Sequence, residues 1–281
     1  MQQKPFVPAG TLQDKVILIT GASQGIGAVA ARGFALAGAK VALGARRGEV
    51  VQQIADEINA AGHEAVGFAL DVTNEDSVIA AVKATVARFG RIDGLFNNAG
   101  KDPDTFVALT DYPLDEWRYI HSVKIDGCFL CTKHVAKQMI AQGHGGAIVN
   151  NGSSSSEYAP PIVPAPSTSQ SALLGLTRSS AVALGPHNIR TNMLFTGMIV
   201  TEERKTGTYA NIGDYAQACC PLRRPGTSED VAQVAAWLLS DYSAYVNGAM
   251  IAVEGGSTSG SNPPGKHDSF LGEREDEGAR A

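Results

Sequence analysis

Short apolar runs alternate along the chain with longer segments in which hydrophobic residues recur at helical spacing. The run KVILIT at 15–20 is typical of a strand that is buried on both faces of a parallel sheet. Strands are predicted at 15–20, 40–44, 65–72, 94–98, 146–152, 190–194 and 249–253. Helices are predicted between them at 26–37, 49–61, 73–89, 114–142, 167–184 and 227–240. Because neighbouring parallel strands need crossover connections, this alternation predicts an α/β fold with a doubly wound parallel sheet.

The predicted elements follow one another without a break, so we expect a single domain over residues 14–256. Residues 1–13 are expected to form a loose N-terminal segment. Residues 257–281 are first rich in Gly, Ser and Pro and then charged, which is typical of a flexible tail. The order Thr-Ser-Glu-Asp at 227–230 predicts a capping box at the start of the last helix.

Composition and charge limit the classes of function that the protein can have. The chain has 281 residues, of which 44% are hydrophobic and 18% charged, so it has enough apolar material for a buried core. A net charge of −5 without a basic run disfavours a nucleic-acid partner, which requires a cationic face. No apolar stretch is long enough to span a bilayer, and residues 1–10 lack the apolar centre of a signal peptide. A cytoplasmic protein with no membrane partner is expected.

The spacing of Cys128 and Cys131 fits either a redox pair or half of a zinc site. The segment GCFLCTKHVAKQM has helical periodicity, however, and neither a second C-x-x-C nor a pair of histidines completes a metal site. We therefore interpret both as small buried side chains on a helix and expect no bound metal. A disulfide between the adjacent Cys219 and Cys220 would be strained, which favours a reducing compartment.

The chemistry-bearing residues begin with a glycine-rich segment, TGASQGIG at 20–27, between the first predicted strand and the first helix. Glycines at this position let the backbone approach a pyrophosphate, whose charge the free N–H groups at the helix start stabilise. Asp71 ends the third strand, where its carboxylate can accept a hydrogen bond from an adenine amino group. The sequence NNAG at 97–100 ends the fourth strand, at the edge where such sheets bind ligands.

These motifs, together with Asp71-Val72 and the late stretch from Arg224-Pro225-Gly226 through Asn247-Gly248 to Glu254-Gly255-Gly256, resemble the short-chain dehydrogenase/reductase family over residues 12–257. The resemblance implies a Rossmann-type sheet, a nicotinamide cofactor and a small-molecule substrate. It also implies a homodimer or homotetramer packed through the helices at 114–142 and 168–184. The expected cofactor-binding residues are Gly21, Ser23, Gln24, Gly25, Ile26, Gly27, Arg46, Arg47, Asp71, Val72, Asn98, Ala99, Gly100, Gln170, Gly197, Ile199 and Thr201.

The end of the second strand indicates which coenzyme is bound. An acidic residue there would bind the ribose 2′-hydroxyl and repel a 2′-phosphate. This chain has Gly44-Ala45-Arg46-Arg47 instead, which offers two guanidinium groups to a phosphate. The sequence therefore favours NADP(H), although both arginines are also compatible with a solvated loop.

The catalytic residues depart from the family pattern. The resemblance implies an Asn-Ser-Tyr-Lys set, in which tyrosine transfers a proton and lysine holds the nicotinamide ribose. In this chain Pro166 stands at the tyrosine position and Gln170 at the lysine position, while Ser153 keeps the serine. Lys124 occupies the asparagine position. Proline cannot transfer a proton, and glutamine can bind a ribose hydroxyl but carries no charge.

Three hypotheses follow. In the first, the protein is a hydride-transfer enzyme with relocated groups: Ser153 polarises the substrate, Lys124 supplies an ammonium and Tyr158 supplies a phenol, with His121 and Glu157 as weaker candidates. In the second, it is a non-redox enzyme on the same scaffold. In the third, it is an NADP(H)-binding pseudoenzyme that serves as a sensor or supports a partner. The fold alone does not decide among them.

The predicted substrate pocket is mostly apolar. Four prolines lie in residues 159–166, and we expect this segment to be stiff and extended and to form one wall. Residues 196–212 are expected to form a lid, in which Thr201 meets the carboxamide of the nicotinamide. The side chains of Met198 and Tyr209 in this lid indicate a mostly apolar ligand.

Overall fold

Within the residues that the computed structural model describes (7–160, 162–202 and 211–259), seven strands form one sheet in the order β3-β2-β1-β4-β5-β6-β9. Every neighbouring pair in it is parallel. The strands are β1 (Val16–Thr20), β2 (Lys40–Ala45), β3 (Ala65–Ala69), β4 (Gly94–Asn97), β5 (Gly146–Ser153), β6 (Ile189–Thr196) and β9 (Met250–Val253). The predicted doubly wound, single-domain α/β fold is confirmed.

The order of the strands reverses between β1 and β4, which are neighbours with Leu18 opposite Leu95. From β1 the chain winds outward to β2 and β3, and it then returns to β4 and winds in the other direction. At such a reversal the crossover helices diverge and leave a crevice beyond the carboxyl ends of the strands. A ligand site is therefore expected beyond Thr20 and Asn97.

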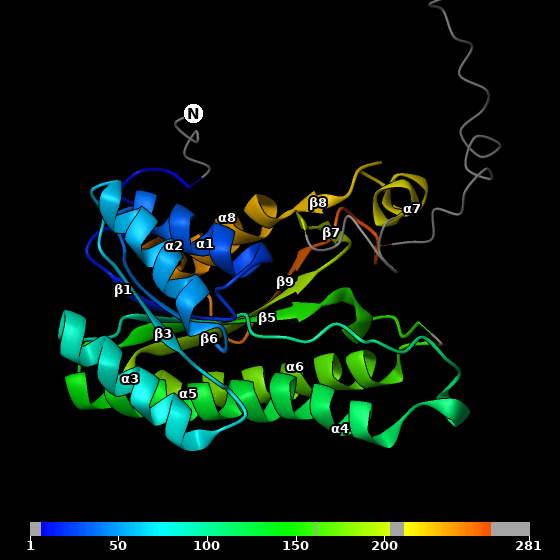
Figure 1. The fold of residues 1–281 in the computed structure, drawn as a ribbon, viewed down its shortest axis with the longest axis horizontal. Helices are drawn as coiled ribbons and strands as arrows, with labels where there is room; N and C mark the ends of the chain where they lie inside the picture. Colours follow the sequence, from blue (N-terminus) through cyan, green and yellow to red (C-terminus); the bar gives the residue numbers. More distant parts are fainter. Residues whose placement is uncertain (1–6, 161, 203–210, 260–281) are drawn as a thin grey trace, which may run out of the picture.

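Helices cover both faces of the sheet (Figure 1). One layer consists of α1 (Gly25–Leu36), α2 (Gly48–Ala60) and α8 (Ser228–Leu239). The opposite layer consists of α3 (Glu75–Phe89), α4 (Leu114–His121), α5 (Gly127–Gln142) and α6 (Pro164–Leu184). Each layer has its own apolar core; in the first, the rings of Phe34 and Phe96 pack with their centroids 6.0 Å apart.

The helix predicted at 114–142 is interrupted. A π-helical turn, Ser122–Asp126, separates α4 from α5 without breaking the direction of the chain. Such a turn accommodates one extra residue per turn, and it occurs frequently at functional sites. In this chain it contains Lys124.

The proline-rich segment differs from the prediction. Pro164 and Pro166 lie in the first turn of α6, which begins three residues earlier than expected, so the extended conformation predicted through 166 is wrong there. Proline fits a first helical turn because its missing N–H would have no partner in the helix. Residue 161 lies outside the described residues.

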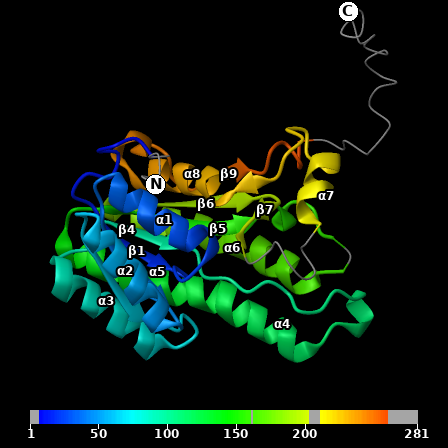
Figure 2. The same cartoon turned by 45° about the horizontal axis from the view of Figure 1, so that its top comes forward.

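Other local predictions can be compared directly with the structure. The capping box of Thr227 and Asp230 at the start of α8 is confirmed. Helix α7 (Ile212–Cys219) and the short strands β7 (Ile199–Val200) and β8 (Gly226–Thr227) were not predicted. They lie at the carboxyl end of the sheet, on the same side as α8 (Figures 1 and 2). This position places β7 beside the expected crevice.

The N-terminal segment and the cysteines can also be compared with their predictions. Residues 7–13 belong to the segment expected to be loose, yet Val7 and Leu12 are buried, and the N–H of Leu12 donates to the carbonyl of Ala37. Cys128 and Cys131 are buried free thiols of α5, which confirms the prediction of small buried side chains on a helix. Among the described residues, no cluster suits a metal ion and no helix is long and apolar enough to cross a membrane.

Candidate active site

A cleft of about 900 Å³ lies at the carboxyl edge of the sheet, between the β1–α1 turn, the ends of β4 and β5, and the start of α6. All the predicted cofactor and catalytic residues line it except Gly27, which lies beneath the β1–α1 turn. The cleft therefore brings together Gly21, Ser23, Gln24, Gly25, Ile26, Arg46, Arg47, Asp71, Val72, Asn98, Ala99, Gly100, Lys124, Ser153, Tyr158, Gln170, Gly197, Ile199 and Thr201.

The glycine turn depends on close backbone contacts. Gly21 has a φ of +67°, and a Cβ on it would lie 2.8 Å from Ala99 Cα. A Cβ on Gly27 would lie 2.3 Å from the carbonyl oxygen of Gly21. Asn98 Nδ2 donates to the carbonyls of Thr20 and Gly21, each at 3.2 Å, and so ties the ends of β1 and β4 together. Only glycine fits these positions without moving the backbone.

The start of α1 is suited to an anion. Its N-cap residue, Gln24, makes no side-chain capping hydrogen bond, so the first N–H groups of the helix lack that partner. Free N–H groups and the positive end of the helix dipole together favour a phosphate group. The residues present thus fit the pyrophosphate of a dinucleotide.

Two arginines lie at the adenosine end of the cleft. Arg47 Nη2 donates to Ser23 Oγ at 3.0 Å and also to Gln24 Oε1, so its guanidinium lies against the glycine turn. Arg46 Nη1 donates to Tyr119 Oη at 2.6 Å, across to α4. All three partners are neutral, so these hydrogen bonds leave the positive charges of both arginines uncompensated.

Asp71 uses one carboxylate oxygen within its own turn. Its Oδ1 accepts from the backbone N–H of Thr73 at 3.0 Å and from Thr73 Oγ1 at 2.7 Å. These contacts fix the carboxylate at the end of β3, beside the cleft. The predicted contact with adenine would therefore use a side chain that is already held in place.

Lys124 is the least ordinary residue of the site. It is 7% exposed, and its Nζ donates to the carbonyl of Asn151 at 2.8 Å and to that of Ala99 at 3.3 Å. Burial lowers the pKa of this ammonium, while the nearby Cys128 and Asp102 act in the opposite direction. A lysine with a lowered pKa gives up a proton more readily than an exposed one.

The two other predicted catalytic residues lie on the segment that follows β5. Ser153 Oγ accepts from the backbone N–H of Ser155 at 3.3 Å and from Ser155 Oγ at 3.2 Å. These bonds occupy the oxygen of Ser153 and leave its own proton for a ligand. Tyr158 follows the 3-10 turn Ser154–Ser156; it is 45% exposed and also lines the cleft.

His121, a weaker candidate, is engaged elsewhere. Its Nδ1 lies 2.8 Å from the carbonyl of Trp117 and its Nε2 lies 3.1 Å from Thr168 Oγ1. The imidazole ring also stacks on the Trp117 ring, with centroids 4.4 Å apart. The residue is not among those lining the cleft, so the structure does not bring it to the site.

Pro166 and Gln170 line the cleft from α6, one helical turn apart. Gln170 Oε1 is buried and has no hydrogen-bond partner among the described residues. The same holds for Oδ1 of Asn151, a cleft residue that the sequence analysis missed because it lies inside a segment interpreted only as a buried strand. Both orphaned oxygens are acceptors that a ligand with hydroxyl groups could satisfy.

Several apolar side chains also line the cleft, beside the polar residues described above. They are Pro103, Pro160, Val163, Pro166 and Met198. Residues 203–210 of the predicted lid, Tyr209 among them, lie outside the described residues.

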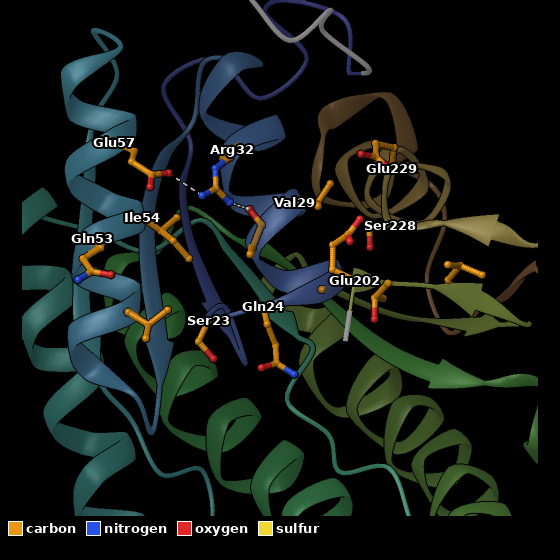
Figure 3. A pocket seen from close by; sticks show the side chains of 15 residues that line it. Ser23, Gln24, Val29, Arg32, Gln53, Ile54, Glu57, Glu202, Ser228 and Glu229 are labelled. Atoms are coloured by element: carbon orange, nitrogen blue, oxygen red, sulfur yellow. Dashed lines mark hydrogen bonds and ion pairs between the residues drawn. The ribbon is translucent and has the colours of Figure 1, made fainter. Parts of the chain in front are cut away.

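A second pocket of about 410 Å³ lies between α1, α2 and the start of α8, behind the glycine turn (Figure 3). It shares Ser23 and Gln24 with the main cleft. Its cation, Arg32, already pairs with Glu57 at 2.6 Å. The sequence analysis did not predict this pocket.

The fold and the cleft together define a Rossmann-type nucleotide-binding protein. A protein-family comparison matches residues 21–258 to the family described as enoyl-(acyl carrier protein) reductase. The chain belongs to the short-chain dehydrogenase/reductase family, whose members bind a nicotinamide cofactor.

Curated relatives are similar over most of their length. The chain is 36% identical to an A-factor type gamma-butyrolactone 1′-reductase (1S-forming) of Streptomyces virginiae, covering 89% of this chain and 97% of that one. It is 37% identical to an L-rhamnose 1-dehydrogenase (NAD(P)(+)) of Sphingomonas sp. (strain SKA58), covering 87% and 96%.

A solved structure of the same family is similar to this chain. The chain matches a short-chain type dehydrogenase/reductase from Mycobacterium marinum with a TM-score of 0.81 and 34% identity. This match covers 91% of the present chain and 98% of the other. The likeness therefore extends over the whole sheet and its cleft.

Proposed function

We propose that the protein is an NADP(H)-dependent oxidoreductase that acts on a carbonyl or alcohol group of a mostly apolar small molecule, using relocated acid/base groups. The observation that carries this proposal is the buried Lys124 ammonium, which lines the same cleft as the glycine turn. A buried charge is costly to keep, and the two hydrogen bonds described above hold this ammonium on backbone carbonyls. A role in catalysis accounts for that cost.

The choice of NADP(H) rests on charge. Arg47 lies against the glycine turn, where it hydrogen-bonds only to neutral side chains in the contacts described above. A 2′-phosphate on the adenosine ribose would add a charge-assisted hydrogen bond to this guanidinium. The name of the rhamnose dehydrogenase relative includes both NAD and NADP, so the family alone does not select between them.

The site's residues have complementary parts in carbonyl reduction. When bound, the nicotinamide supplies the hydride, which adds to the carbonyl carbon. Ser153 donates its hydroxyl proton in a hydrogen bond to the substrate oxygen. The phenol of Tyr158 transfers a proton to that oxygen, and the half-exposed tyrosine regains one from solvent. The Lys124 ammonium stabilises the negative charge that develops during the transfer. Alcohol oxidation follows the same steps in reverse.

The second candidate is a protein that binds NADP(H) without redox chemistry, either as a non-redox enzyme or as a pseudoenzyme. The observation that favours it is Pro166 in the first turn of α6, at the position where the family resemblance implies tyrosine. Proline has no proton to transfer at that place.

A turnover assay separates the two candidates. The wild-type protein and the double variant Pro166→Tyr/Gln170→Lys are each mixed with NADPH and a panel of apolar ketones and aldehydes, and absorbance of NADPH is followed. Turnover by the wild type that is lost in Lys124→Ala or Tyr158→Phe supports relocated catalysis. Tight NADPH binding with turnover only in the double variant would contradict it and favour the second candidate.

The proposal includes a homodimer or homotetramer in the cytoplasm. Phe129 on α5 and Val182 on α6 are 48% and 80% exposed, and burial of these apolar side chains against a second copy is favourable. Light scattering of the purified protein should give a mass of two or four chains. A monomer at micromolar concentration would contradict this part of the proposal.

A further inference from the structure

The segment that follows β4 runs directly past the ammonium of Lys124. The carbonyl of Ala99 accepts a hydrogen bond from Lys124 Nζ at 3.3 Å. A Cβ built on Gly100, the next residue, would lie 3.5 Å from Nζ and 3.8 Å from Cε of the same lysine. Asp102 follows two residues later and lines the same cleft as Lys124. The chain therefore brings a carboxylate into the surroundings of the buried amine.

Contacts within the segment and with α4 hold it in this position. Glu116 Oε1 of α4 accepts from the backbone N–H of Asp104 at 2.6 Å. The side chain of Asp104 also pairs with Lys101 at 2.5 Å. The short stretch that carries Asp102 is therefore fixed at both ends, on one side against Lys124 and on the other against α4.

Of the titratable groups on the elements around the π-helical turn, Cys128 of α5 and Asp102 act on the charge of Lys124. The same elements also carry the side chains of Lys101, Glu116, His121, Glu157, Tyr158 and Arg178. Burial raises the pKa of the Cys128 thiol, so this side chain is uncharged at neutral pH. Asp102 is exposed, and an exposed carboxyl group is ionised at neutral pH. Of the two groups that act on Lys124, Asp102 therefore provides the negative charge.

We propose that Asp102 is the counter-ion of Lys124 and keeps this buried side chain protonated. An amine that is taken out of water tends to lose its proton, and a carboxylate nearby opposes that loss. The part that Asp102 plays in catalysis rests on the proposed function, in which the Lys124 ammonium stabilises the charge that develops on the substrate oxygen. Asp102 acts through Lys124 and not on the reacting atoms, so it is a positioning residue.

The test follows the protonation of Lys124 directly. In protein labelled with ¹³C at the Cε of lysine, the NMR shift of each side chain reports its protonation without any need for turnover, and Lys124→Met identifies the signal of Lys124. Asp102→Asn keeps the shape of the side chain and removes its charge. The titration midpoint of Lys124 should therefore move to lower pH in this variant. The alkaline limb of the turnover profile should move in the same direction.

Three further variants make the result specific. Asp104→Asn is the matched control, because it removes a carboxylate from the same segment that pairs with Lys101, and it should leave the midpoint in place. Asp102→Glu retains the charge and should titrate as the wild type does. Asp102→Ala should shift the midpoint as Asp102→Asn does, and added formate should move it back, whereas the same concentration of chloride should not.

The outcomes separate this inference from the proposed function. An unchanged midpoint in both Asp102→Asn and Asp102→Ala would overturn the counter-ion. Equal shifts in Asp102→Asn and Asp104→Asn would also overturn it, because they would reflect net charge alone. Neither result touches the proposed function, which is tested by the turnover of the wild type and Lys124→Ala. A midpoint that shifts only in the Asp102 variants of a protein without turnover would support the counter-ion and overturn the proposed function.

Discussion

The two ends of the cleft are built differently. At the glycine turn the fit is made by backbone, since Cβ atoms on Gly21 or Gly27 would lie 2.8 and 2.3 Å from other main-chain atoms. At the substrate end it is made by side chains, chiefly Lys124 from a π-helical turn and Tyr158 from the segment after β5. The first end depends on a short local motif, and the second on elements that are far apart in the sequence.

The two ends of the cleft therefore differ in how well they tolerate amino-acid substitutions. A backbone cradle tolerates almost no substitution, because any side chain would collide with neighbouring main-chain atoms. A set of side chains can be reassigned, provided another element brings an equivalent group to the same cleft. Under the proposed function, this accounts for a nucleotide end that keeps the family's glycine motif while Pro166 and Gln170 stand where the resemblance implies tyrosine and lysine.

The largest effect is expected from Gly27→Ala. The added Cβ meets the carbonyl of Gly21 at 2.3 Å, so the turn must move, at a cost of about 1–3 kcal/mol of stability. Nucleotide binding should be lost altogether, as measured by titration with NADPH. The matched control is Gly175→Ala in α6, where a Cβ meets nothing within 4 Å and helix propensity should raise stability by up to about 1 kcal/mol. Undiminished binding by Gly27→Ala would contradict the backbone account.

The next largest effect is expected from Lys124→Met, which keeps the length of the side chain but removes the ammonium. Turnover should fall by about 10²–10³, the range for the loss of one group that stabilises charge in the transition state, while the fold is retained. The same substitution at Lys137, an exposed residue of α5, should leave turnover unchanged. Equal activity in the wild type and Lys124→Met would show that the substrate end of the cleft does not depend on this side chain.

The fold and the position of the glycine turn could be predicted from the sequence because both depend on local patterns. Apolar runs and helical periodicity gave the seven strands and the order of the helices, and the glycines of 20–27 identified the turn. The structure was needed for what arises from contacts between distant segments. The buried hydrogen bonds of Lys124 with Ala99 and Asn151, and the orphaned oxygen of Asn151, cannot be inferred from spacing.

Errors in the prediction have physical reasons as well. Pro164 and Pro166 were expected to keep the chain extended. The first turn of a helix accepts proline, however, and α6 begins at Pro164. Helix α7 and the pair β7–β8 are too short to give a clear hydrophobic period, and β7–β8 forms through pairing of residues more than twenty positions apart.

A smaller effect is expected at the adenosine end. Arg47→Gln should weaken the binding of NADPH by about 10- to 100-fold, as expected for the loss of a charge-assisted hydrogen bond. The binding of NADH should stay unchanged. Arg46→Gln is the matched comparison. The Arg46 guanidinium contacts Tyr119 rather than the glycine turn, so the loss of NADPH affinity in this variant should be smaller. Dissociation constants measured by fluorescence titration check both. Equal losses on NADPH and NADH would show that Arg47 does not recognise the 2′-phosphate.

The smallest effect concerns stability and pH, and it tests whether Lys124 is desolvated when the cleft has no ligand. Burial lowers its pKa below the ordinary value of 10.5, so between the lowered value and 10.5 the unfolded chain binds more protons than the folded one. Stability must rise with pH across that window, by about 1.4 kcal/mol for each unit by which the pKa is lowered. Urea denaturation at a series of pH values should therefore show that the free energy of unfolding of the wild type increases relative to that of Lys124→Met as the pH approaches 10.5. All other titrating groups are the same in the two proteins. A constant difference would mean that the two backbone carbonyls fully replace the lost water, and that Lys124 is no stronger an acid than a surface lysine.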